Sequence, residues 1–251
     1  MAVRYAPLPL TPLFALLSLL TACATPDLPP RTTDYQELLR LFDDWRAFEQ
    51  PPTREGAPDY TAARKGRAHA ALSDNRARLD AIDSSHWPVE QQVDWQVVRA
   101  EFNGFDFNCR VLRPWARDPA FYQTVWTYQS DVPAHEGPTN HAVLELWTYD
   151  FPLTKSEEAR LVRELGVIPP LLQQARANLT GNAAELFEAG IEHIRRQDGV
   201  LVSIGERAGQ DASPELVSAL REARQATQEM VRWLEAEAPS KTGPSGIGKD
   251  N

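Results

Sequence analysis

Cysteine is scarce in this chain of 251 residues, which holds only Cys23 and Cys109. No two cysteines lie three positions apart, so a zinc site built from paired thiolates is excluded. If Cys23 carries a lipid, Cys109 has no partner and no intramolecular disulfide can form. Cys109 lies among large apolar residues, in the stretch FNGFDFNCRVL, and we interpret it as a small buried hydrophobic side chain rather than a nucleophile.

Several motifs that would identify an enzyme are also missing. The sequence has no P-loop, no GxGxxG fingerprint, no GxSxG elbow and no internal repeat. Acidic pairs such as Asp43-Asp44 and Glu157-Glu158 are typical of solvated helix faces, so we do not interpret them as the paired carboxylates of a glycosidase.

Positive charge is in short supply. The 26 lysines and arginines stand against 35 aspartates and glutamates, a net charge of −9, and no basic stripe is present. Because neutralisation of phosphates dominates affinity for nucleic acids, this balance predicts that no nucleic acid is a partner.

The chain also lacks a long hydrophobic run. Its most apolar stretch, Leu8 to Leu20, covers about 13 residues, whereas a membrane-spanning helix needs roughly 20. Arg4 precedes this stretch and small residues follow it, which is the pattern of an export signal over residues 1–22. The stretch ends in Leu-Thr-Ala-Cys, which resembles the bacterial lipobox and predicts lipidation of Cys23. The alternative is an ordinary signal peptide with an incidental cysteine.

A lipid on Cys23 would set the location of the protein. Acyl chains anchor a protein through their buried methylene groups, so the membrane becomes a partner without any transmembrane helix. Ala24, rather than an aspartate, follows the cysteine, which favours the outer membrane in the usual sorting pattern. We therefore expect a bacterial cell-envelope protein on the periplasmic face of the outer membrane, with residues 23–34 as a tether.

Apolar residues recur at helical spacing through most of the region 35–238, which predicts an all-α fold with an irregular array of several helices. The tail 239–251 is rich in Gly, Pro and Ser, and we expect it to be truncated. Helices are predicted through the run from Leu38 to Phe48, which Pro51-Pro52 ends, and over residues 58–83, 88–112, 154–167, 171–179, 183–208 and 213–237. Within the last of these, the apolar stripe comprises Leu216, Leu220, Ala223, Thr227, Met230 and Leu234. Within 88–112, the predicted core face comprises Val93, Val97, Ala100, Phe105, Cys109 and Leu112.

The segment 113–153 breaks this helical pattern. Prolines at positions 114, 119, 133, 138 and 152 exclude a long helix, and aromatic residues are frequent. We expect one long proline- and aromatic-rich loop segment that is packed rather than disordered.

This segment contains HEGPTNH, residues 135–141, which invites comparison with a zinc peptidase. A zincin motif places two histidines four positions apart on one helix face, whereas His135 and His141 are six apart and Gly137-Pro138 separates them. We therefore interpret the stretch as a turn rather than a metal site. His69, His86 and His193 are interpreted as helix-surface, boundary or turn residues.

Longer blocks resemble the bacterial domain-of-unknown-function 885 family. They include WPVEQQVDWQVVRAEFNGFDFNCRVLRPWARDPAFY at 87–122, then QSDVPAHEGP, ELWTYDFPL, IPPLLQQARANLTGNA and WLEAEAPSKTGPSGIGKDN. The resemblance covers about Tyr35 to Asn251. It implies a mainly helical, exported or lipid-anchored protein similar to zinc metallopeptidases, whose catalytic element is a His-Glu-x-x-His helix supported by a downstream glutamate.

That element is absent from these 251 residues, and family members are roughly twice as long. The resemblance therefore implies that this chain is an N-terminal half. No catalytic, cofactor-binding or metal-binding residue is transferred to it, and zinc and a peptide substrate are expected only for the full-length form. We expect the isolated half to leave an apolar face uncovered and so to self-associate.

Three interpretations remain open. The chain is an inactive N-terminal portion of a zinc-peptidase-like lipoprotein, or a non-catalytic helical lipoprotein that serves as a binding or scaffold module, or an enzyme with an unrecognised site of its own. The reading frame downstream of Asn251 would separate the first two.

Overall fold

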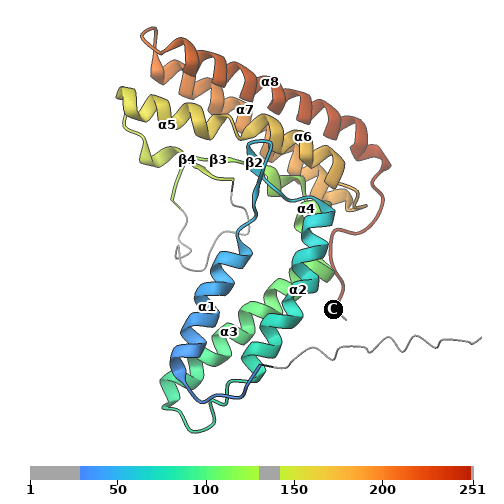
Figure 1. Cartoon of the computed structure of the whole chain (residues 1–251). Helices are drawn as coiled ribbons and strands as arrows, with labels where there is room; N and C mark the ends of the chain where they lie inside the picture. The colour runs from blue at the N-terminus through green and yellow to red at the C-terminus, as the bar shows by residue number, and fades with distance from the viewer. Residues whose placement is uncertain (1–28, 130–141, 250–251) are drawn as a thin grey trace, which may run out of the picture.

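The computed structural model describes residues 29–129 and 142–249, and it confirms the predicted all-α class (Figure 1). The α-helices are α1 (Tyr35–Glu49), α2 (Ala62–Asp80), α3 (Val89–Phe107), α4 (Pro114–Arg117), α5 (Lys155–Leu165), α6 (Ile168–Asn178), α7 (Ala184–Ala208) and α8 (Pro214–Glu237). The described strands have two residues each: β1 (Thr53–Arg54), β2 (Ala57–Pro58), β3 (Val125–Trp126) and β4 (Leu144–Glu145). Short helical turns are η1 (Asn108–Leu112), η2 (Pro119–Tyr122), η4 (Leu146–Thr148) and η5 (Ala238–Ser240).

Local sequence signals explain where the helices begin. Thr154 and Glu157 form the capping box predicted for α5, since the Thr154 hydroxyl accepts from the Glu157 amide and the Glu157 carboxylate accepts from the Thr154 amide. Ser213 caps α8, and Pro214 follows in its first turn. The Thr61 hydroxyl accepts from the Arg64 amide, so α2 begins at Ala62, later than predicted.

The helices form two groups with separate cores (Figure 1). We call α1, α2 and α3 the small lobe, and the remaining elements from α4 onward the large lobe. Trp45 is the centre of the small-lobe core: it is fully buried and its ring lies 4.5 Å from that of Phe102 and 5.1 Å from that of Phe105. Aromatic pairs at these separations add to the stability that burial alone provides.

The large lobe is built on α6, α7 and α8. All six residues of the stripe predicted for α8 are buried, which confirms that prediction. From α7, Phe187, Ile194, Leu201 and Ile204 face the same core and are fully buried.

The prediction for the core face of α3 was wrong for Val93, Val97 and Ala100, which are exposed, whereas Phe105 and Cys109 do pack against the two cores. Val93 and Val97 are 53% and 50% exposed, whereas Val98 and Phe102 are buried. At about 100° per residue, Phe105 lies about 120° around the helix from Val93, so the predicted positions do not form one face. The helix has two apolar faces, and the face with the bulky rings packs against α1 and α2.

The described part of segment 113–153 is packed, as predicted. Trp115, Phe121, Tyr122 and Tyr149 are buried in the large-lobe core. The segment contains α4 and η2, and its strands β3 and β4 pair in parallel. Helix α7 holds β3 through Gln197, whose side-chain oxygen accepts from the amides of Thr124 and Val125 at 2.7 and 3.1 Å.

The chain passes from the small lobe to the large lobe through η1, and the loop between α1 and α2, which carries the antiparallel β1–β2 pair, makes a second connection. Gln174 of α6 accepts from the Tyr60 amide and donates to the Pro58 carbonyl. Asn178 donates to the Tyr60 carbonyl and to the Tyr122 hydroxyl. These bonds fix the loop on α6 and so set the position of the small lobe.

The tail beyond α8 lies along the start of α7. Thr242 donates its amide to the Asn182 side chain, and the Ala184 amide donates to the Gly243 carbonyl. The Ser245 hydroxyl donates to Glu185, and Arg117 of α4 donates to the Ser245 carbonyl. The Gly/Pro/Ser-rich tail is therefore hydrogen-bonded to the large lobe as far as Ser245.

Candidate functional site

The two sequence features with the most chemistry lie outside the described residues. Cys23, the predicted lipidation site, precedes residue 29, and HEGPTNH at 135–141 falls between residues 129 and 142. Their interpretations therefore stay predictions.

The remaining three histidines lie apart from one another. His69 on α2 contacts Asp106 of α3, with 2.7 Å between Nε2 and Oδ1. His193 on α7 contacts Gln123, with 2.9 Å between Nδ1 and Oε1, and His86 is exposed in a turn. Within residues 29–129 and 142–249, no group of three or more His, Cys, Asp and Glu side chains is placed to hold a metal ion.

Asp106 is the centre of an ionic cluster on the small lobe. Besides His69, it accepts from Arg110 at 2.9 Å from Nε and 2.6 Å from Nη2, and Arg76 lies 3.7 Å away. The hydrogen bonds from Arg110 and His69 hold the pKa of the Asp106 carboxyl well below its usual range. The cluster crosslinks α2 to the end of α3, which is a structural role.

Close to this cluster, Lys65 of α2 reaches from the small lobe to aromatic rings at the junction of the lobes. Its Nζ lies 4.7 Å from the centre of the Trp115 ring and 5.2 Å from that of Tyr60. Burial lowers the pKa of the Lys65 ammonium.

Two more titratable groups contribute to the electrostatics of this junction. Burial raises the pKa of the Glu49 carboxyl to about 7, with Arg46 opposing the shift and Glu101 adding to it. Burial also raises the pKa of the Cys109 thiol, against the charge of Lys65. Cys109 is half-buried against the large-lobe core, so at neutral pH it is a packed thiol and not a thiolate nucleophile, in agreement with the sequence interpretation.

This junction cluster, Glu49, Lys65 and Cys109, was not predicted from the sequence. Its members come from three helices and carry no spacing motif, so only the fold brings them together. A carboxyl and an ammonium with displaced pKa values are the groups used in acid–base chemistry. The contacts of Lys65, however, are with aromatic faces, which is the geometry of a support between lobes.

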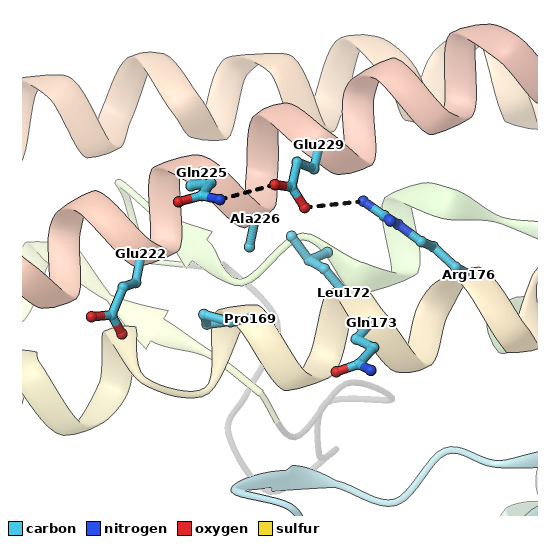
Figure 2. A pocket seen from close by; sticks show the side chains of 8 residues that line it. All are labelled: Pro169, Leu172, Gln173, Arg176, Glu222, Gln225, Ala226 and Glu229. Carbon is cyan, nitrogen blue, oxygen red and sulfur yellow. Dashed lines mark hydrogen bonds and ion pairs between the residues drawn. The ribbon is translucent and has the colours of Figure 1, made fainter.

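A shallow groove of about 380 Å³ runs between α6 and α8 (Figure 2). Figure 2 shows a row of polar side chains along it: Glu229 lies 3.7 Å from Arg176 of α6 and accepts from Gln225 at 3.0 Å. Its walls are Pro169, Leu172, Gln173, Arg176, Glu222, Gln225, Ala226 and Glu229. The arrangement can present both donors and acceptors to a polar ligand. Sequence reasoning missed the groove because its two sides are about 50 residues apart.

Comparisons with known proteins support the fold. No family model matches the chain, and no curated protein matches it. A solved structure from Shewanella oneidensis, described as that of "a putative lipoprotein of unknown function", aligns with a TM-score of 0.56 at 15% identity. The alignment covers 83% of this chain and 38% of that protein.

At 15% identity this likeness shows a shared fold and nothing finer. The chain spans about 38% of the length of the structure it resembles. The resemblance to the domain-of-unknown-function 885 family therefore stays an expectation that depends on the sequence blocks. None of the helices in the described part of the chain is both long and apolar enough to cross a membrane.

Proposed function

We propose that this chain is the N-terminal portion of an exported, lipid-anchored protein that resembles zinc-dependent peptidases, and that it is inactive by itself. The observation that carries the proposal is the fold shared with a longer protein described as a lipoprotein, 38% of which the alignment covers. Two sequence features support it independently: the Leu-Thr-Ala-Cys ending before residue 24, and the blocks that resemble the family between residues 87 and 251.

The proposed location follows from the anchor. A diacylglycerol on Cys23 would hold the folded part on the periplasmic face of the outer membrane through residues 23–34. The described helices would then be entirely outside the bilayer. In the full-length form, this portion would form one side of a channel for a peptide substrate, while the missing part would supply zinc and its ligands.

The anchor is tested by fractionating cells that express the full chain or its Cys23→Ser variant. The wild type should sediment with the outer membrane, and Cys23→Ser should remain in the soluble periplasmic fraction. Cys109→Ser is the matched control, because it removes the other thiol and should leave fractionation unchanged. Equal membrane association of the wild type and Cys23→Ser would refute lipidation at this position.

The absence of activity is tested separately. Purified full chain carrying Cys23→Ser should contain no stoichiometric zinc and should not cleave peptide substrates. Stoichiometric zinc together with peptidase activity would show that the chain holds a site of its own. The reading frame downstream of Asn251 tests whether this chain is the N-terminal portion of a longer protein. A His-Glu-x-x-His helix encoded there supports the proposal.

A second candidate function is a non-catalytic binding or scaffold module. The groove between α6 and α8 favours it and would be its binding surface, because Arg176, Gln225 and Glu229 can present donors and acceptors to a polar ligand. A stop codon after Asn251 followed by unrelated sequence would favour this candidate over the first.

A further inference from the structure

The small lobe is attached to the rest of the molecule at one end only (Figure 1). The chain passes between the lobes at three places, which are the end of α1 at Glu49, the start of α2 at Ala62 and the end of α3, where η1 begins. The loop bonded to α6 fixes the position of this attached end. Because the two lobes have separate cores, the small lobe is an arm whose angle can change without disturbing either core.

The connection through η1 departs from regular helix geometry. Asn108–Leu112 form a π-helical turn, and Arg113 follows in the left-handed conformation with a φ of 45°. Such a conformation is uncommon for a residue with a side chain, and it persists only where its surroundings hold it. Here the Arg113 amide donates to the Asn108 carbonyl at 2.8 Å, and the residue is exposed. Hinges are commonly a few residues at the ends of elements that absorb a change in backbone angles, as this stretch is placed to do.

A charged side chain reaches from the arm to the large lobe. The Lys65 Nζ, near the start of α2, lies 4.7 Å from the centre of the Trp115 ring and 5.2 Å from that of Tyr60. Both rings belong to the large-lobe core and are at most 6% exposed. The face of an aromatic ring attracts a cation, and more strongly where water is excluded. The contact lies beside the attached end, so it favours one angle of the arm.

We propose that the small lobe is a hinged arm, that η1 and Arg113 are its hinge, and that Lys65 is the latch that holds it against the large lobe. The inference goes beyond the proposed function, and the hinge does not depend on it. If Cys23 carries the proposed lipid, the arm also sets orientation. The Thr32 amide donates to the Ala81 carbonyl at the free end of the arm, so the tether joins the arm far from the hinge. Release of the latch would then let the large lobe tilt relative to the membrane.

The experiment measures the distance between the lobes by double electron–electron resonance. The full chain carrying Cys23→Ser and Cys109→Ala is spin-labelled at Asp43→Cys on α1 and Val217→Cys on α8, both of which are exposed positions. This parent should give one narrow distribution of distances. Lys65→Met keeps a long side chain and removes the charge. It should raise the share of molecules at other distances by about 5- to 30-fold, because it removes the attraction to two rings.

Two matched variants separate the latch from other effects of the substitution. Lys65→Arg keeps a cation over the rings and should retain the distribution of the parent. Arg99→Met removes a cation 5.8 Å from the Trp95 ring within the arm itself, and it should also retain that distribution. An unchanged distribution in Lys65→Met would overturn the latch, and so would an equal broadening by Arg99→Met.

Hydrogen exchange tests the position of the hinge, in the full chain that carries only Cys23→Ser in addition to the latch variant. In Lys65→Met, the amides of η1 and Arg113 should exchange faster than in the parent, whereas those of α1 and α7 should keep their rates. Faster exchange throughout α1 would mean that the arm unfolds rather than swings, and would overturn the proposal. Unchanged exchange in η1 would exclude it as the hinge.

Discussion

The side chain of Gln197 is the best single test of how the large lobe is held together. It is 1% exposed on α7, and its oxygen accepts from the amides of Thr124 and Val125. Its amide nitrogen lies 3.3 Å from the Thr227 hydroxyl of α8. One residue therefore links α7 to β3 and to α8. Gln197→Leu keeps the size of the side chain and removes every one of these hydrogen bonds.

The expected loss of stability follows from the two backbone donors. Thr124 and Val125 are 1% and 2% exposed, so water cannot replace the lost acceptor without rearrangement. A buried donor without a partner costs about 1–3 kcal/mol, which gives about 2–6 kcal/mol for the pair. Burial of the more apolar leucine offsets part of this, so we expect about 3–4 kcal/mol. Such a loss is a large fraction of the roughly 5–15 kcal/mol that stabilises a typical domain.

Thermal unfolding followed by circular dichroism measures this effect. For a chain of this size, about 3–4 kcal/mol corresponds to a decrease in Tm of about 10 °C. Gln225→Leu is the matched control, because Gln225 is exposed on α8 and donates to Glu229 at the surface. Its Tm should change by no more than about 2 °C, as for most surface substitutions. If Gln197→Leu had the same Tm as Gln225→Leu, the conclusion that the Gln197 side chain holds β3 on α7 would be refuted.

Two further tests concern backbone packing and pH. On α7, Gly190→Ala should lower the free energy of unfolding by about 1–3 kcal/mol in urea titrations, because its Cβ would lie 2.6 Å from Pro119. Gly199→Ala is the control: its Cβ would meet open space, so it should raise the free energy of unfolding by about 0.5–1 kcal/mol. Equal effects of the two substitutions would contradict the contact with Pro119. The raised pKa of Glu49 means that the folded state favours the protonated acid, so its ionisation destabilises the fold progressively as pH rises from about 4.5 to about 7. The Tm of Glu49→Gln relative to wild type should therefore increase between pH 5 and pH 8, and a constant difference would count against the burial of this carboxyl.

Helix positions could be read from the sequence where local signals were complete. The prediction of 213–237 against an observed α8 of Pro214–Glu237 depended on a Ser cap, a proline in the first turn and an unbroken stripe. Pro169 and Pro170 mark a boundary, but both lie in the first turn of α6, because the early positions of a helix do not need backbone donors.

The packing of segment 113–153 was predicted only in outline. Its aromatic content indicated a buried segment, but nothing local identifies Gln197 as the residue that holds β3. A glutamine in the middle of a helix ordinarily faces solvent. Here the two amides that donate to the Gln197 oxygen belong to residues more than 70 positions away in the sequence. Contacts of this kind depend on the tertiary fold, as do those of Lys65 with Trp115 and Tyr60.

Helix α3 shows why periodicity alone could not find the buried face of a helix. The heptad-like spacing through Val93 and Val97 is more regular than the buried set of Val98 and Phe102, so the sequence favours the wrong face. The core instead takes the face with larger rings, because Phe102 fills the space beside Trp45. The regular face is then left exposed on the small lobe. Spacing alone therefore does not decide which apolar stripe of a helix is buried; the volume and shape of the side chains that meet it decide.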